Sequence, residues 1–405
     1  MNQKQRAGYD QNFFKQGLFI TLTVILVLLC VSNGWSAAPS TGETMPGLEA
    51  FDLQMVRVID KYDIPGATLA VSFKGNLVLA RGYGYAHKSF MSKVSVQPQN
   101  RFRLASLCKP FTATAIMILN EEGKLPLEAK IIPLLEELAP PKIRDDRVKQ
   151  ISVQHLLEHR AGFDRKVGGD PMLDPKPPCP GDLASFLSGN LDYSPGEKFA
   201  YSNVGYCILG RIIEKVTKKA YLDFLKERIL EPLGIRSIEL GDSIRARENE
   251  VSYFWSAGEK PLPYGGFKLE GMDAVGGLIG NAVDYLRFLT SVDGQRLPRL
   301  IAPSTFSKML SMPDDPSLQD KPTYYAKGFN VRKLQNGGVN FWHYGSLPGT
   351  STVAIRTASG YGWVALLNRR FAGDMYKVNI EVDRALWDAA RSVKEVPVGD
   401  LFYKY

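Results

Sequence analysis

Apolar patterns typical of β-strands lie near both ends of this sequence, and helical patterns fill the part between them. Residues 67–73 and 77–85 predict two strands around a hairpin turn at Lys74-Gly75-Asn76. Toward the C-terminus, further strands are predicted at residues 327–334, 338–343, 351–357 and 361–368. This order of elements predicts an α+β fold with one antiparallel sheet that both ends of the chain build.

Helical periodicity is concentrated between the two groups of strands. The segments that show it are 110–122, 151–159, 182–190, 204–216 and 219–230, with single helices expected around Phe51–Tyr62 and at 378–393. We therefore expect an antiparallel sheet flanked by helices, with its sheet part at 48–105 and 290–395 and an inserted all-helical lobe at 106–289. A polar linker at 39–47 precedes this domain, and a tail at 396–405 follows it.

Residues 1–38 have the composition of a targeting segment. Basic residues precede an apolar run from Leu18 to Val31, which is about the length of a signal-peptide core and short for a spanning helix. Cleavage as a signal peptide and retention as a membrane anchor are both open. Because basic flanks stay in the cytoplasm, we expect the rest of the chain to be exported to the periplasm or another extracytoplasmic side of the membrane.

Charge and cysteine spacing exclude several classes of protein. The net charge of +8 is spread along the chain without a run of five basic residues, so no nucleic-acid partner is expected. The cysteines Cys30, Cys108, Cys179 and Cys207 do not have the spacing of a disulfide framework or a zinc site. Beyond the N-terminal segment, one disulfide bond and three free thiols are both compatible with the sequence.

Ser106-Leu107-Cys108-Lys109 is the first segment that could carry chemistry. On a helix, residues three apart share a face, so the Ser106 hydroxyl and the Lys109 ammonium can meet. Pro110 is tolerated best near a helix start, which places Ser106 at or close to the helix N-terminus. Free N–H groups and the helix dipole at that end can stabilise an oxyanion. Taken alone, the segment fits a helix cap equally well.

Two further segments indicate a functional site only when they are considered together with Ser106-Leu107-Cys108-Lys109. Tyr201-Ser202-Asn203 precedes an apolar helix, and its phenol needs a cationic neighbour such as Lys109 in order to ionise. His343-Tyr344-Gly345-Ser346 ends a strand-like run, and Gly345 would let the backbone approach a ligand closely. Read in isolation, each is more typical of structural residues than of a site.

The three segments together resemble a known set. S-x-x-K, an S-D-N element and K-T-G mark the penicillin-binding enzymes, and this chain has Tyr-Ser-Asn second and His-Tyr-Gly third. Weaker likenesses lie in Phe102-Arg103-Leu104-Ala105, Pro110-Phe111-Thr112-Ala113, Tyr193-Ser194-Pro195-Gly196 and Gly276-Gly277-Leu278. Over residues 48–395 the sequence resembles the β-lactamase-like serine hydrolases, in the branch of class C β-lactamases, D-amino-acid peptidases and carboxylesterases.

This resemblance implies a site between the sheet and the helical lobe, and it assigns roles. The matching positions are Ser106 as acylated nucleophile, Lys109 as its partner, Tyr201 as general base, and Asn203, His343, Gly345 and Ser346 as substrate-binding residues. The sequence itself leaves open whether Tyr201, as phenolate, or Lys109, as free amine, takes the Ser106 proton. The amides of Ser106 and Ser346 match the oxyanion hole. His343 stands where many members carry lysine, which argues against β-lactamase activity.

The implied activity is hydrolysis of an ester or amide through an acyl-enzyme, with no cofactor and no metal. Small-molecule esters, amides or peptides, including cell-wall peptides, are the expected substrates. A true β-lactamase or a D-Ala-D-Ala carboxypeptidase is the alternative within the family. The segment Gly162–Pro195, which is rich in glycine and proline, is expected to be a loop that controls substrate choice.

Two readings from other classes compete with this one. His155-Leu156-Leu157-Glu158-His159 fits the H-x-x-E-H pattern of zinc peptidases, in which two histidines on one helix face bind the metal. A non-catalytic protein that binds envelope peptides would keep the fold but predicts a broken set of catalytic residues, and here all three segments are present.

Overall fold

The computed structural model describes residues 38–138, 140, 142–168, 170–174, 176, 178–256, 260–371, 374 and 376–405. Apart from its last residue, the targeting segment predicted at 1–38 lies outside the described residues. Within the described ranges, no helix combines the length and the apolar character that crossing a membrane requires.

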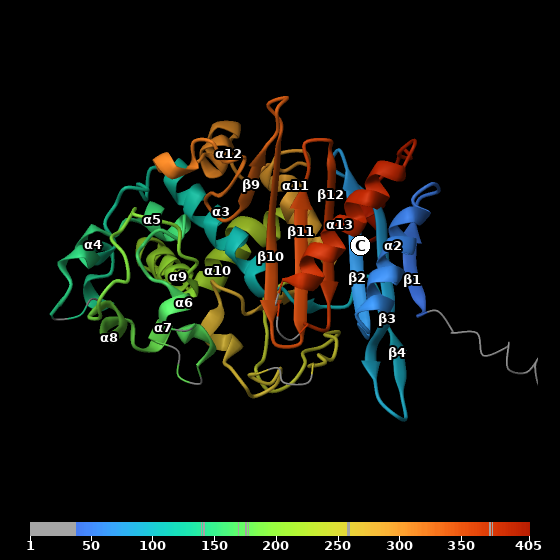
Figure 1. The fold of residues 1–405 in the computed structure, drawn as a ribbon, viewed down its shortest axis with the longest axis horizontal. Helices are drawn as coiled ribbons and strands as arrows, with labels where there is room; N and C mark the ends of the chain where they lie inside the picture. The colour runs from blue at the N-terminus through green and yellow to red at the C-terminus, as the bar shows by residue number, and fades with distance from the viewer. Residues whose placement is uncertain are drawn as a thin grey trace, which may run out of the picture. The chain divides into compact units, whose positions relative to one another are not determined.

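A large antiparallel sheet forms the centre of the described chain (Figure 1). Its strands follow the order β1-β3-β2-β12-β11-β10-β9-β8, and β4 pairs with β3. Their bounds are β1 (Ser40–Thr44), β2 (Gly66–Phe73), β3 (Asn76–Lys88), β4 (Lys93–Ser95), β8 (Thr323–Tyr325), β9 (Asn330–Lys333), β10 (Val339–Leu347), β11 (Thr350–Arg356) and β12 (Tyr361–Leu367). Because β2 pairs antiparallel with β12, strands from the two ends of the chain meet in mid-sheet, which confirms the predicted architecture.

Helices cover both faces of this sheet, so its central strands are buried on both sides. Strands β11 and β12 are buried throughout, which explains their almost continuous apolar sequence. Helices α2 (Glu49–Lys61) and α13 (Lys377–Ser392) pack together, and with one face of the sheet they enclose a core around Trp363. Helix α11 (Ala282–Val292) packs on β2 and β12 from the opposite face, where Val364 and Leu366 point.

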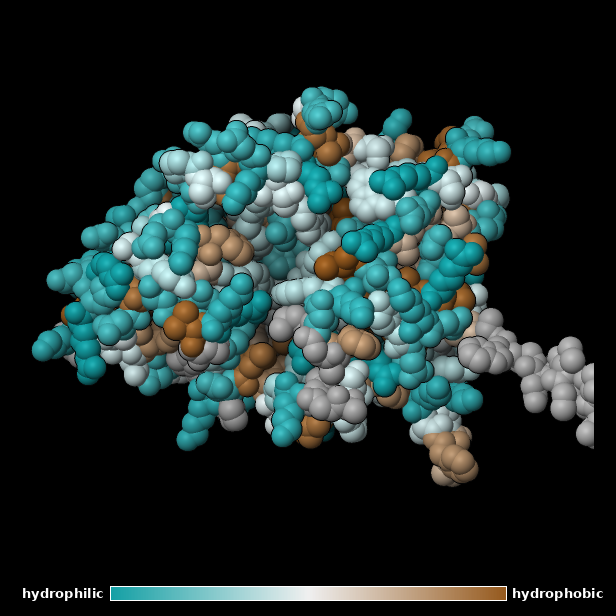
Figure 2. Space-filling view, viewed as in Figure 1, coloured by the Kyte–Doolittle hydropathy of each residue, from teal (hydrophilic) through white to brown (hydrophobic). Residues whose placement is uncertain are grey.

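The other helices gather beside β10, to the left in Figure 1. Their bounds are α3 (Cys108–Glu121), α4 (Ile131–Leu134), α5 (Val153–Leu157), α6 (Arg165–Gly168), α7 (Pro178–Gly181), α8 (Leu183–Leu187), α9 (Asn203–Thr217), α10 (Tyr221–Leu225) and α12 (Pro303–Leu310). A small sheet of β5 (Phe102–Arg103), β7 (Leu278–Gly280) and β6 (Glu239–Leu240) accompanies them, so the lobe predicted as all-helical also contains short strands. Figure 2 shows a mainly hydrophilic surface that is hollowed between these helices and the sheet.

The segment predicted as a polar linker differs from the expectation. Residues Ser40–Thr44 form the edge strand β1, which pairs antiparallel with β3. The Thr41 hydroxyl donates a hydrogen bond to the carbonyl of Val96, which fixes this strand to the neighbouring loop. Because an edge strand of small polar residues lacks an apolar alternation, its pairing depends on β3 and was not visible locally.

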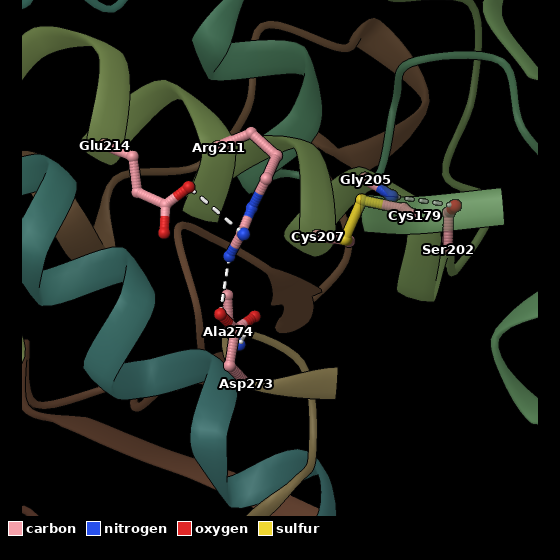
Figure 3. The surroundings of a disulfide bond; sticks show 8 residues. All are labelled: Cys179, Ser202, Gly205, Cys207, Arg211, Glu214, Asp273 and Ala274. Carbon is pink, nitrogen blue, oxygen red and sulfur yellow. Dashed lines mark hydrogen bonds and ion pairs between the residues drawn. A yellow bond between two sulfur atoms is a disulfide. The ribbon is translucent and has the colours of Figure 1, made fainter. Parts of the chain in front are cut away.

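One disulfide bond joins the segment Gly162–Pro195 to helix α9 (Figure 3). It links Cys179 of α7 to Cys207 of α9, and Cys108 is a buried free thiol. Of the two cysteine states that the sequence allowed, the structure has the single bond. The proline-rich segment is therefore a set of short helices attached to α9 rather than a free loop.

Helix α9 is fixed in turn by its own capping and ion pairs. The Ser202 hydroxyl accepts the backbone N–H of Gly205 and caps the helix start, directly after Tyr201. One turn past the disulfide, Arg211 forms ion pairs with Asp273 at 2.5 Å and with Glu214 at 3.1 Å (Figure 3). These contacts give the residues just before α9 a defined position.

Candidate active site

Ser106 lies in a short 3-10 turn, η1 (Ala105–Leu107), directly before helix α3. The preceding residue, Ala105, has a φ of +51°, a left-handed conformation that is unusual for a residue with a side chain and stores local strain. Pro110 falls in the first turn of α3, where its missing N–H costs no hydrogen bond. The predicted position of Ser106 at a helix N-terminus is therefore confirmed.

Lys109 and Tyr201 both reach the Ser106 hydroxyl. Lys109 Nζ lies 3.2 Å from Ser106 Oγ, and the Tyr201 hydroxyl lies 2.9 Å from the same oxygen. Lys109 Nζ also donates a hydrogen bond of 2.9 Å to the carbonyl of Val275. A nucleophile within hydrogen-bond distance of two proton-transfer groups is the arrangement that acyl transfer requires.

Burial sets the protonation of this group. Lys109 is completely buried, and burial lowers its pKa from 10.5 to about 7. Burial raises the pKa of Tyr201 well above 10, although the hydrogen bond to Ser106 and the Arg165 guanidinium act in the opposite direction. Near neutral pH, a free amine on Lys109 can accept the Ser106 proton while the phenol of Tyr201 donates one. The sequence left the choice of base open, and these shifts favour Lys109.

Gly345 lets strand β10 lie directly against the serine turn. A Cβ atom at Gly345 would come within 2.2 Å of Thr352 Oγ1 and 2.9 Å of the Leu104 carbonyl oxygen, so no side chain fits. The Thr352 hydroxyl also donates to the Leu104 carbonyl over 3.0 Å, which ties β11 to the same turn. The close approach that the sequence predicted between Gly345 and a ligand is instead an approach to the protein's own Ser106 turn, and it brings the end of β10 beside Ser106.

A cavity of about 490 Å³ opens at Ser106. The side chains and backbone that line it are Ser106, Arg165, Lys166, Asp170, Leu173, Asn203, Met272, Val275, Gly276, Ser346, Leu347, Arg370, Asp374 and Tyr376. Four of these residues come from the segment Gly162–Pro195, as expected of a segment that shapes the substrate site. The volume suits a small molecule or a short peptide end.

Two buried polar atoms at this cavity have no hydrogen-bond partner among the described residues. They are Asn203 Oδ1 and Ser346 Oγ. The Asn203 amide nitrogen donates to Asp170 Oδ2, which fixes the orientation of the amide and leaves its oxygen free to accept. Because buried polar atoms are normally satisfied, these two are suited to a polar group of a bound substrate.

Arg165 and Asp170 line the cavity, although the sequence analysis did not predict them as site residues. They form an ion pair of 3.5 Å, and the Arg165 guanidinium carbon lies 4.4 Å from the ring centroid of Tyr201. No local motif marks either residue, because both belong to the irregular segment Gly162–Pro195. The one signal in the sequence was that this segment leads directly into the Tyr201 turn.

His343 is buried in the wall behind the site, with 2 % of its surface exposed. Its Nδ1–H donates to the carbonyl of Tyr344 at 2.7 Å, so its Nε2 accepts from the Tyr325 hydroxyl at 3.1 Å. Burial lowers its pKa from 6.5 to about 3. His343 is therefore a neutral residue at this strand position and brings no positive charge.

The histidines of the zinc-peptidase pattern do not share a helix face. Helix α5 ends before His159, which has a φ of +54°. His155 forms part of the α5 capping box, His159 Nδ1 accepts the backbone N–H of Ser202, and Glu158 pairs with Lys327 at 2.8 Å. Across the described ranges, no group of three or more histidine, cysteine or acidic side chains is placed to hold a metal.

The serine turn, the buried Lys109 and Tyr201 thus meet at one cavity, an arrangement of a hydroxyl and two proton-transfer groups that suits acyl transfer. The chain belongs to the Beta-lactamase family, whose model matches residues 51–386. One curated relative is the putative fimbrial assembly protein FimD, serogroup D, of Dichelobacter nodosus, 34% identical over 65% of each chain. Protein flp of Staphylococcus aureus (strain MW2) is 30% identical over 44% of this chain and 35% of its own. The chain thus spans less than two thirds of the length of these relatives.

Solved structures share this fold at low sequence identity. The D-amino acid amidase from Ochrobactrum anthropi SV3, complexed with L-phenylalanine amide, has a TM-score of 0.69 at 24% identity and covers 87% of this chain and 100% of its own. The octameric penicillin-binding protein homologue from Pyrococcus abyssi has a TM-score of 0.67 at 24% identity, covering 87% and 80%. EstCE1, a hydrolase with promiscuous acyltransferase activity, has a TM-score of 0.66 at 21% identity, covering 84% and 98%.

Proposed function

We propose that this chain hydrolyses an ester or amide through an acyl-enzyme on Ser106, with the specificity of a carboxylesterase or a D-amino-acid peptidase. The observation that carries the proposal is the Ser106 hydroxyl, which contacts both Lys109 and Tyr201 and opens onto the cavity. The names of the amidase and esterase neighbours support this class of substrate.

In the proposed reaction, Ser106 Oγ attacks the substrate carbonyl carbon while Lys109 Nζ takes the hydroxyl proton. The oxyanion is held at the N-terminal end of α3 and the adjoining end of β10. Tyr201 gives its proton to the leaving group as the bond to that group breaks, and the Lys109 ammonium restores the phenol. Water then attacks the Ser106 ester by the same proton transfers and frees the acid.

The rate should depend on pH through Lys109. Its pKa is lowered to about 7, so the amine is protonated and inactive below that pH and free above it. We therefore expect kcat/KM for an uncharged ester to rise with pH and to level off above about pH 7. A pH–rate profile that rises only near 10.5 would show that Lys109 titrates as an ordinary lysine and is not the base.

The neutral His343 should favour substrates that lack a carboxylate. A lysine at this strand position would offer a fixed charge to the carboxylate of a penicillin or a peptide terminus, and a neutral imidazole does not. We expect a short-chain aryl ester to have a higher kcat/KM than a chromogenic cephalosporin. His343→Lys should raise the cephalosporin-to-ester ratio by about tenfold, the scale of one hydrogen bond to a charged group.

A panel of aryl esters, D-amino-acid amides, D-alanyl dipeptides and a cephalosporin measures this preference directly. Thermal denaturation of His343→Lys must accompany it, because the site is buried. If the wild-type protein already turns over the cephalosporin with the highest kcat/KM, the protein is a β-lactamase and the charge argument is wrong.

We further propose that this domain acts outside the cytoplasm. The basic and apolar N-terminal segment supports export, and so does the Cys179–Cys207 bond, because disulfides persist mainly in oxidising compartments. In protein that is quenched with acid and taken directly from cells, we expect Cys179 and Cys207 to resist alkylation until a reductant is added. Alkylation of both thiols without reductant would contradict the proposed location.

A further inference from the structure

The phenol of Tyr201 is surrounded by titratable groups from both parts of the fold. Those that face it are Lys109 of α3, His159 after α5, Arg165 of α6, Tyr206 of α9, Tyr325 of β8, His343 of β10 and Tyr376 before α13. Burial lowers the pKa of both histidines far below neutrality, so they are uncharged. Arg165 and Lys109 are therefore the cations of this group of described residues.

Arg165 is held in place by several contacts. Its guanidinium carbon lies 4.4 Å from the centroid of the Tyr201 ring, a distance at which a cation and an aromatic face attract each other. Asp170 forms an ion pair with the same guanidinium at 3.5 Å, and the Asn203 amide nitrogen donates to the same carboxylate. The Arg165 side chain is 24% exposed and that of Asp170 is 12% exposed, so solvent screens this pair only in part.

We propose that Arg165 is a positioning residue that supplies a permanent positive charge beside the Tyr201 ring and acts through Tyr201 and Lys109 rather than by binding the substrate. This inference rests on the proposed function. This charge comes from the segment Gly162–Pro195, on the lobe side of the cavity. In many proteins that this sequence resembles, a lysine on β10 occupies the position of His343.

The positive charge of Arg165 lowers the pKa of both Tyr201 and Lys109. An arginine is charged at every working pH, so it favours the phenolate of Tyr201 and disfavours the ammonium of Lys109. Both effects lower a pKa, and Arg165 lowers the pKa of each residue, although at Lys109 the Asp170 carboxylate acts more strongly in the opposite direction. In the proposed reaction, the cation stabilises the Tyr201 oxygen when its proton passes to the leaving group, and it keeps Lys109 available as a base.

The test is the pH profile of kcat and kcat/KM for an uncharged aryl ester in Arg165→Met. Removing the cation should move the rising limb of Lys109 and the falling limb of Tyr201 to higher pH, each by roughly 0.5–1 unit, which is a modest value for one screened neighbouring charge. At pH 7 we expect kcat to fall by roughly two- to fivefold, which is the loss of free Lys109 amine that such a shift from a pKa of about 7 produces, with recovery at higher pH, while KM changes less than about twofold. Arg165→Lys should shift the pH–rate profile in the same direction as Arg165→Met, but by a smaller amount.

Lys166→Met is the matched control, because it removes one positive charge from the next residue at the rim of the same cavity. The rising and falling parts of its pH–rate profile should lie at the same pH as in the wild-type protein, even if its KM changes. Arg165→Met with unmoved limbs and a raised KM would overturn the proposal and make Arg165 a substrate ligand. Equal shifts in both variants would overturn it in favour of a general charge effect.

Two further measurements separate this inference from the proposed function. The melting temperature of each variant shows whether it is folded, and Arg165→Lys carries the test if Arg165→Met does not fold. Labelling of Ser106 by a fluorophosphonate in the wild-type protein tests the acyl-enzyme itself. If Ser106 is labelled normally but the pH–rate profile of the Arg165 variants is not shifted, only the proposed role of Arg165 is wrong and the acyl-enzyme proposal stands.

Discussion

Ser106→Ala is expected to abolish ester and amide turnover while the protein stays folded. The hydroxyl is the atom on which Lys109 Nζ at 3.2 Å and the Tyr201 phenol at 2.9 Å converge, and alanine removes it without adding volume. Losing a nucleophile in a catalytic unit of this kind costs about 10⁶-fold in kcat in a well-studied serine protease, so the residual rate should lie at background. Initial rates on an aryl ester measure the loss.

The melting temperature is the control for this variant, and it should stay close to that of the wild-type protein. The strained conformation belongs to Ala105, which the substitution leaves unchanged. Turnover above about one hundredth of the wild-type rate in a folded Ser106→Ala protein would mean that another group carries the reaction.

Tyr201→Phe is expected to lower kcat by roughly 10²–10⁴-fold, the range for losing a positioned acid–base group. The ring and its packing against His159 are retained, with centroids 4.2 Å apart, and only the hydroxyl that contacts Ser106 is removed. Because Lys109 still accepts the Ser106 proton, the missing step is protonation of the leaving group. The loss should therefore be larger for substrates with poor leaving groups, such as amides, than for activated aryl esters.

Tyr206→Phe is the matched control for that variant. Tyr206 is fully buried in the same aromatic group, but its hydroxyl donates to the carbonyl of Leu157 at 2.9 Å instead of to Ser106. We expect Tyr206→Phe to cost about 1 kcal/mol of folding free energy, the value of one hydrogen bond, and less than threefold in kcat. Comparable kcat losses in the two variants would show that Tyr201 acts by packing.

The parts of the site that the sequence predicted are those that local geometry fixes. Ser106 and Lys109 are three residues apart at the start of a helix, and Pro110 marks that start, so their contact follows from helix geometry. The central strands could also be predicted, because strands buried on both faces carry long apolar runs such as Tyr361–Leu367. Tyr201 and Gly345 were found only because their segments follow Ser106 in the order of a known set.

The parts that the sequence did not predict depend on how distant segments meet. Arg165 contacts Tyr201 because the segment Gly162–Pro195 folds over the site and is tied to α9 by the Cys179–Cys207 bond, and neither contact has a local signature. Strand β1 was missed because it is a polar edge strand whose partner is β3. The neutral state of His343 follows from its burial and its two hydrogen bonds, which only the tertiary structure determines.

The central claim is that Ser106 forms the acyl-enzyme, and covalent labelling tests it most directly. The wild-type protein is treated with a fluorophosphonate and digested, and the modified peptide is sequenced by mass spectrometry. Ser346→Ala serves as the comparison, because Ser346 lines the same cavity. We expect the adduct on Ser106 in the wild-type protein and in Ser346→Ala, and no adduct in Ser106→Ala. An adduct on any other residue, or none in the folded wild-type protein, would contradict the account.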